Sequence, residues 1–200
     1  MKKVLSVFLA IVVVVSTMPI LEVSATSRTQ AEAIVWINSQ IGAYTSIVNG
    51  NKVYDEDNSF GTQCVDLIRF YYRWLGATPV TGHAYQYETN HLPSIFTRLS
   101  KSQIGGNSGI RPGDIIVQGR GVGDAHRDTG HVSIAVAVNG NSVDIVHSSP
   151  GIIPRPANNA VTDFTCVIRP NFVGGSSTNS LTSIDIPNGT YIICYSCVKC

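Results

Sequence analysis

The stretch HVSIAVAVNGNSVDIVH, residues 131–147, predicts an antiparallel β-hairpin and decides the fold class. Apolar residues alternate with small or polar ones on both sides of a central Asn-Gly-Asn segment, which is a strong turn signal. If residues 139–141 form the turn, His131 and His147 lie on one face of the hairpin as diagonal neighbours. The hairpin therefore predicts a pair of histidines held close together.

The register of this hairpin decides which side chains share a face. With a three-residue turn, Val138 pairs with Ser142, and Ser133 lies opposite His147. A slip of one residue would move His147 to the other face. We expect a helix to pack closely on the histidine face, because its other residues on the first strand are small: Ser133, Ala135 and Ala137. We expect the opposite face to be core, and its residues are Val132, Ile134, Val136 and Val138.

Two helices are predicted before the hairpin. The first begins at a capping box, Thr29-x-x-Glu32. A polar loop over residues 49–61 leads to the second helix, residues 64–75, with Thr62 as its N-cap. Shorter helices and further strands complete the pattern: helices near 84–88 and 93–99, strands at 114–118 and 164–169. Helices followed by a run of antiparallel strands predict an α+β fold, with N-terminal helices packed on a small antiparallel sheet.

Cys64 lies at the start of the second predicted helix. The N-terminus of a helix offers free N–H groups and a positive dipole, which favour a thiolate and predict a lowered thiol pKa. The same N–H groups can stabilise the oxyanion that forms when a thiolate attacks an amide. His131 would take the thiol proton, and His147 would hold the His131 ring in the useful tautomer. Cys166, on a late strand, is expected to be buried and inert.

The first residues are typical of a secretory signal peptide. Two lysines precede an apolar run over residues 4–15, and a small-residue cleavage site ends at Ala25. Pro19 and Glu22 interrupt the run too early for a membrane anchor, which needs about 20 apolar residues. We therefore expect residues 1–25 to be removed, and the mature protein to be secreted and not associated with a membrane.

The rest of the chain divides into three parts. We expect a catalytic domain over residues 26–171, a Gly/Ser-rich linker over 172–180, and a tail over 181–200 that is too short for a core of its own. The three tail cysteines have zinc-like spacing without a fourth ligand, and a disulfide is the alternative: Cys194, Cys197 and Cys200. Removing the leader turns the formal charge of +1 into neutrality, which argues against a nucleic-acid partner.

Three blocks of the sequence resemble the CHAP domain in order and spacing: FGTQCVDL at 60–67, RPGDIIV at 111–117 and GHVSIAV at 130–136. CHAP domains are papain-like cysteine amidohydrolases and peptidases in peptidoglycan hydrolases of Gram-positive bacteria and their phages. The resemblance implies Cys64 as nucleophile and His131 as base. Many CHAP domains have Glu, Asp or Asn at the third position. Here VHSS at 146–149 is similar to the NlpC-type peptidases, which implies His147 in that role.

A second resemblance concerns metal binding. The pattern Asp55-x-Asp57-x-Ser59, together with Asp66, is similar to the calcium loop of some phage CHAP endolysins. Calcium prefers several oxygen ligands from a flexible loop. The resemblance therefore implies a structural Ca²⁺ bound by Asp55, Asp57 and Asp66, while the chemistry itself requires no cofactor. The alternative is an ordinary polar loop with aspartates at turns.

Together with the predicted leader, the resemblance implies a secreted, cell-wall-associated and monomeric peptidoglycan hydrolase. It would act as an N-acetylmuramoyl-L-alanine amidase or as a peptide endopeptidase, and the sequence does not separate the two. The alternatives are another papain-like enzyme acting on a protein or small amide, and an inactive wall-binding or adhesin module. Residues 186–191 resemble the opening of a ricin-type carbohydrate-binding repeat, which would make the tail a truncated wall-binding domain.

Overall fold

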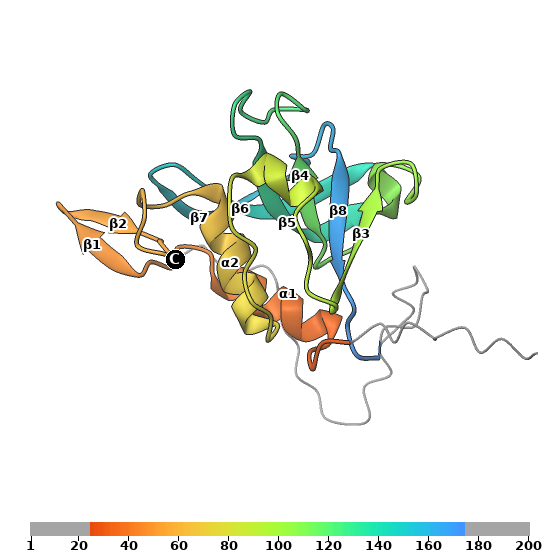
Figure 1. Ribbon diagram of the computed structural model, residues 1–200, viewed down its shortest axis with the longest axis horizontal. Coiled ribbons are helices and arrows are strands. Elements are labelled where there is room, and N and C mark those ends of the chain that lie inside the picture. The colour runs from red at the N-terminus through yellow and green to blue at the C-terminus, as the bar shows by residue number, and fades with distance from the viewer. Residues whose placement is uncertain (1–24, 175–200) are drawn as a thin grey trace, which may run out of the picture.

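A six-stranded antiparallel sheet forms the centre of the computed structural model, which describes residues 25–174 (Figure 1). The strand order is β3-β8-β4-β5-β6-β7. The predicted signal peptide apart from Ala25, most of the predicted linker, and the tail with its three cysteines lie outside the described residues. The strands of the sheet are β3 (Phe96–Ser100), β4 (Ile115–Gln118), β5 (His131–Asn139), β6 (Ser142–Ser149), β7 (Ile152–Ala157) and β8 (Cys166–Pro170).

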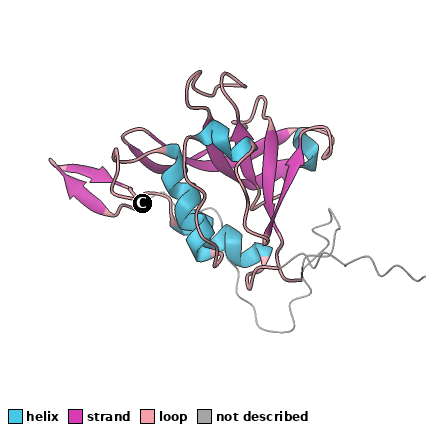
Figure 2. Cartoon of the chain, viewed as in Figure 1, coloured by secondary structure: helices cyan, strands magenta, loops and turns pink. Residues whose placement is uncertain are grey.

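The helices lie mainly before the sheet in the sequence and beside it in space (Figure 2), so the predicted α+β class is confirmed. A small hairpin of β1 (Ser46–Val48) and β2 (Asn51–Val53) projects from the body of the domain (Figure 1). None of the described helices is long and apolar enough to cross a membrane. The helices are α1 (Gln30–Ser39), α2 (Cys64–Trp74) and two short 3₁₀ helices, η1 (Ala84–Glu88) and η2 (Asn107–Gly109).

The two main helices differ in how closely their starts follow the local sequence. The Thr29 hydroxyl accepts from the Glu32 N–H, and the Glu32 carboxylate accepts from the Thr29 N–H, so the predicted capping box is present. Helix α2 has Gln63 as its N-cap, not Thr62. The Thr62 hydroxyl is buried and accepts from the Tyr54 N–H instead. A tertiary partner thus competes for the hydroxyl that local propensity assigns to the helix end.

The sheet is buried on both faces. Helices α1 and α2 pack with one cluster, which includes Val132 and Ile134 of β5. The Ala135 face packs with a second cluster that contains Ile145 and Phe164. The prediction that a helix packs on the face of the small residues is therefore wrong. The large branched side chains bury more apolar area against the helices, and the small ones lie beneath the loops on the other side.

The β5–β6 hairpin turns one residue later than predicted. Asn139 pairs with Ser142, so the turn has two residues, not three. A β-bulge between Ala135 and Ala137 then shifts the register, and Ile134 pairs with Val146. A bulge inserts one extra residue into one strand, so it restores the pairing that the sequence predicts near the histidines. The predicted three-residue turn is therefore wrong, and the prediction that His131 and His147 share one face of the hairpin is confirmed.

Two other predictions of secondary structure fail. The helix expected near residues 93–99 is strand β3, which pairs with β8 from Phe96 to Ser100. Pairing along a neighbouring strand outweighs the weak helical pattern there. The polar loop expected over residues 49–61 begins with strand β2, because residues 49 and 50 form the tight turn of the small hairpin, with positive φ at both Asn49 and Gly50.

Candidate active site

Asp66 fixes the start of helix α2, where Cys64 is the first helical residue. Its carboxylate accepts from the Gln63 N–H at 2.6 Å and from the Glu56 N–H at 3.0 Å, and the residue is only 1% exposed. The Ser148 hydroxyl donates to the Gln63 carbonyl at 2.8 Å and so ties the helix start to β6. These bonds hold the cysteine in one position relative to the sheet.

The Cys64 thiol is free and half-buried. The N–H groups of Val132, Cys64 and Val65 interact with its sulfur and favour the thiolate. Burial outweighs them, so the pKa of the Cys64 thiol is raised, with Asp66 adding a smaller contribution in the same direction. The predicted lowering of this pKa is wrong, because the helix N-terminus that favours a thiolate also lies in a desolvated position. The free protein therefore holds a neutral thiol at neutral pH.

The two histidines of the hairpin meet as predicted. His131 Nε2 lies 3.1 Å from His147 Nδ1, and the rings are nearly perpendicular at 85°. Burial, and then the neighbouring His147, lower the pKa of His131 to about 4. Burial, and then Arg155, lower the pKa of His147. Both rings are therefore neutral at neutral pH.

Cys64 lies beside the start of β5, the strand that begins with His131. The sulfur interacts with the N–H of Val132, which directly follows His131 in the strand. His147 occupies Nε2 of the His131 ring and leaves Nδ1 as its other nitrogen. The arrangement has the elements of nucleophilic catalysis: a thiol at a helix start, a base, and a group that orients the base.

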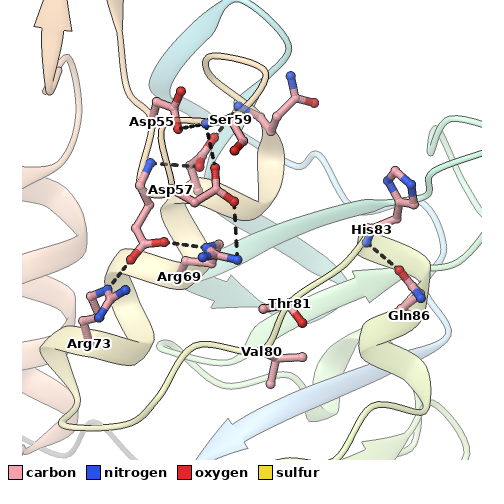
Figure 3. Close-up of polar contacts among 12 residues, drawn as sticks. Asp55, Asp57, Ser59, Arg69, Arg73, Val80, Thr81, His83 and Gln86 are labelled. Atoms are coloured by element: carbon pink, nitrogen blue, oxygen red, sulfur yellow. Dashed lines mark hydrogen bonds and ion pairs between the residues drawn. The ribbon is translucent and has the colours of Figure 1, made fainter.

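The acidic residues of the predicted calcium loop also come together. Carboxylate oxygens of Asp55, Asp57 and Asp66 lie within 4.8 Å of one another. The Ser59 N–H donates to one oxygen of Asp55 at 3.2 Å and to one of Asp57 at 3.0 Å (Figure 3). Burial, with smaller contributions from Asp55 and Asp57, raises the pKa of Asp66 to about 6. The cluster is therefore a concentration of negative charge that is costly without a cation.

Neighbouring arginines compensate only part of this charge. Both Arg69 and Arg73 form ion pairs with Glu56, and Arg69 also lies 3.6 Å from Asp57 (Figure 3). The group of four carboxylates thus keeps two more negative than positive charges. Ligands at the usual Ca²⁺–oxygen distance of about 2.3–2.6 Å can be up to about 5 Å apart across the ion, so the observed spacing fits a bound Ca²⁺.

Two residues of the site lacked a recognised sequence signal. Ser148 anchors the start of helix α2 through the Gln63 carbonyl, and no pattern in the sequence indicates this role. Arg155 on β7 lies opposite His147 and donates from Nε to His147 Nε2 at 3.4 Å. The residue pattern of β7, interrupted by Pro154 and Pro156, does not indicate a strand paired with β6. Cys166 is buried on β8, as predicted.

A family model and two solved structures are similar to parts of this chain. Residues 53–149 match the family model described as the CHAP domain. The crystal structure of the wild-type endolysin LysIME-EF1 aligns with a TM-score of 0.58 at 19% identity, covering 74% of this chain and 66% of that chain. The crystal structure of Ly7917 with the hydrolyzing product of MDP aligns with a TM-score of 0.48 at 21% identity, covering 72% and 63%.

The chain spans less than two thirds of the length of both proteins, and the alignment with LysIME-EF1 shows a common fold. Comparison with the curated proteins gives no match.

Proposed function

Residues 53–149 of this chain are a CHAP domain, and on that premise we propose that the protein is a secreted peptidoglycan hydrolase. It cleaves amide bonds of the stem peptide or cross-bridge, as an N-acetylmuramoyl-L-alanine amidase or as an endopeptidase, and acts as a monomer on the cell wall. The observation that carries the proposal is the contact of His131 Nε2 with His147 Nδ1 beside the start of the cysteine helix. The catalytic domain is assigned to residues 26–171.

In the proposed reaction, Cys64 is the nucleophile and His131 is its base. Unprotonated Nδ1 of His131 takes the thiol proton as the sulfur attacks the amide carbonyl, and the C–N bond then breaks. The amine leaves with the proton from His131, and the acyl group stays on sulfur as a thioester. A water molecule, deprotonated by His131, hydrolyses the thioester. N–H groups of the first turn of α2 stabilise the oxyanion in both steps.

Hydrolysis by the full chain can be distinguished from wall binding alone. We expect the protein to release free amino groups from purified Gram-positive peptidoglycan and to clear the suspension. Cys166→Ala, which alters a buried thiol on β8, should leave the release unchanged. If the protein sediments with peptidoglycan but releases no amino groups, it is an inactive wall-binding module and the proposal fails.

The acid limit of the activity should reflect His131. Since burial lowers the pKa of His131 from its ordinary value of 6.5 to about 4, the base stays unprotonated well below neutrality. We expect kcat/KM to fall with acid at a midpoint near pH 4. The measurement is a pH–rate profile with a soluble stem-peptide substrate. A midpoint near 6.5 would show that His131 is not desolvated in the free enzyme.

The same shift predicts how stability depends on pH. Between pH 4 and 6.5 the unfolded chain binds a proton at His131 and the folded chain does not, so stability rises with pH across this window. The contribution is complete above pH 6.5 and is lost as the pH falls to 4, by about 3 kcal/mol. Urea unfolding measures the free energy of unfolding at pH 7 and at pH 4. The difference between the two values should be smaller by this amount in His131→Ala than in the unaltered protein. An equal difference in both proteins would contradict the shift.

We further propose that Asp55, Asp57 and Asp66 hold a structural Ca²⁺. The excess of two negative charges and the 4.8 Å spacing of the carboxylate oxygens support this assignment. When bound, the ion supplies positive charge that favours the ionised form of Asp66. Asp66 caps the helix that begins with Cys64 through the Gln63 N–H, so the ion braces the nucleophile without contacting the substrate.

Calcium should therefore stabilise the protein. At pH 7 and a concentration about 100 times its dissociation constant, we expect Ca²⁺ to raise Tm by about 5–10 °C. The rise should be smaller at pH 5, where Asp66 is largely protonated. Differential scanning fluorimetry with CaCl₂ against NaCl of equal ionic strength measures it. Asp57→Asn should abolish the effect, and Asp124→Asn on an exposed loop should retain it. No rise in the unaltered protein would contradict the assignment.

A further inference from the structure

Arg155 is a cationic side chain that forms a hydrogen bond with the histidine pair. It lies directly opposite His147 in the pairing of β6 with β7, and its side chain is exposed. Its Nε donates to His147 Nε2 at 3.4 Å. Within residues 25–174 its guanidinium forms no ion pair, unlike those of Arg69, Arg73 and Arg169. Both Nη groups are therefore available to an anion.

The hydrogen bond from Arg155 determines where the protons of the histidines lie. A guanidinium can only donate, so His147 Nε2 must be unprotonated to accept. A neutral His147 then carries its proton on Nδ1, which lies 3.1 Å from His131 Nε2. His131 Nε2 must accept in turn, so a neutral His131 carries its proton on Nδ1. One donor at the edge of the sheet thus sets the tautomer of both rings.

This tautomer of His131 is the wrong one for a base. Nδ1 is the nitrogen left for the Cys64 thiol, and a protonated Nδ1 cannot take the thiol proton. We propose that Arg155 is a positioning residue that holds the histidine pair in an unreactive tautomer until a carboxylate of the substrate draws its guanidinium away. The inference rests on two contacts in series, from Arg155 to His147 and from His147 to His131.

A carboxylate is the group that suits the donor geometry of the Arg155 guanidinium. Arginine binds carboxylates through two parallel N–H···O bonds, and these charge-assisted bonds are stronger than a bond to a neutral imidazole. Stem peptides of peptidoglycan carry free carboxylates, so this part rests on the proposed function. With Arg155 engaged elsewhere, His147 Nε2 can take a proton from water and pass its Nδ1 proton to His131 Nε2. The Nδ1 proton of His131 leaves to water, and each ring keeps one proton.

The tautomers can be measured without turnover. In the full chain labelled with ¹⁵N-histidine, long-range ¹H–¹⁵N spectra at pH 7 distinguish Nδ1–H from Nε2–H rings, and single histidine-to-glutamine variants assign the five histidines. We expect Nδ1–H for both His131 and His147, and Nε2–H for both in Arg155→Ala. Arg120→Ala, which removes an arginine stacked on Tyr85, should leave the spectra unchanged. Nε2–H rings in the unaltered protein would overturn the proposal.

The carboxylate step has its own test in the same spectra. Cys64→Ala protein is titrated with the stem peptide L-alanyl-D-isoglutamyl-L-lysine amide, in which the α-carboxyl group of the isoglutamyl residue is either free or amidated and the lysine carboxyl group is amidated in both peptides. The free carboxylate should convert both rings to Nε2–H at a concentration about tenfold or more below that of the amide. Equal effects of the two peptides would overturn the carboxylate trigger. Since neither experiment needs hydrolysis, a failure of the proposed function would appear separately, as no release of amino groups from peptidoglycan.

Discussion

Replacing His131 with alanine is expected to lower the rate of amide hydrolysis by about 10⁴-fold, because the thiol then has no base. Burial raises the pKa of the Cys64 thiol, so the sulfur does not ionise by itself at neutral pH. The leaving amine also loses its proton donor. The measurement is the rate of amino-group release from purified peptidoglycan at pH 7, with protein concentrations matched by circular dichroism of the folded state.

Two further variants separate this role from a general loss of structure. His91→Ala alters an exposed histidine outside the pair and should retain full activity. His147→Ala should lower the rate less than His131→Ala, because it removes the group that orients the base and leaves the base in place. A His131→Ala protein that is folded and retains more than about one tenth of the activity would contradict the assignment of the base.

Replacing Asp114 with alanine is expected to destabilise the fold by about 3–5 kcal/mol. The carboxylate is 1% exposed and accepts from Arg169 at two positions, Nε at 2.9 Å and Nη2 at 2.7 Å. It also accepts from the Arg111 N–H at 2.8 Å. Removing it leaves the guanidinium of Arg169, whose side chain is only 15% exposed, without a counter-ion at the junction of β4 and β8, which is the costly case for a largely buried pair.

Urea unfolding at pH 7 measures this effect, and an exposed ion pair provides the control. Lys101 and Asp163 form a pair whose side chains are 45% and 50% exposed. Asp163→Ala should therefore cost no more than about 1 kcal/mol. Equal losses in Asp114→Ala and Asp163→Ala would show that the burial of the Asp114–Arg169 pair has no special weight in the fold.

The parts of the fold that were predicted correctly depend on local chemistry. The Thr29–Glu32 capping box, the helix that begins at Cys64 and the alternating strands around residues 139–141 each follow from neighbours in the sequence. The parts that failed depend on distant partners. Phe96 is in a strand because β8 lies beside it, and Thr62 caps no helix because Tyr54 uses its hydroxyl.

The histidine pair shows how a correct site can come from an incorrect turn. The predicted register assumed a three-residue turn, whereas the observed turn has two residues and a bulge between Ala135 and Ala137 corrects the difference. No local signal in a Val-Ala repeat marks where a bulge will form. The burial of the Cys64 thiol also depends on tertiary packing, so helix position alone predicts a lowered pKa where desolvation raises it. Arg155 was missed because only the pairing of β7 with β6 brings it to His147.

The central claim, that Cys64 hydrolyses amide bonds of the cell wall, is tested most directly by the chemistry of the released products. Purified peptidoglycan is digested by the full chain in H₂¹⁸O, and the soluble fragments are identified by mass spectrometry beside those from Cys64→Ala. We expect fragments with new free amino termini and one ¹⁸O in each new carboxyl group, and we expect these fragments to be absent with Cys64→Ala. New reducing sugar ends without new amines, or equal release by Cys64→Ala, would contradict it.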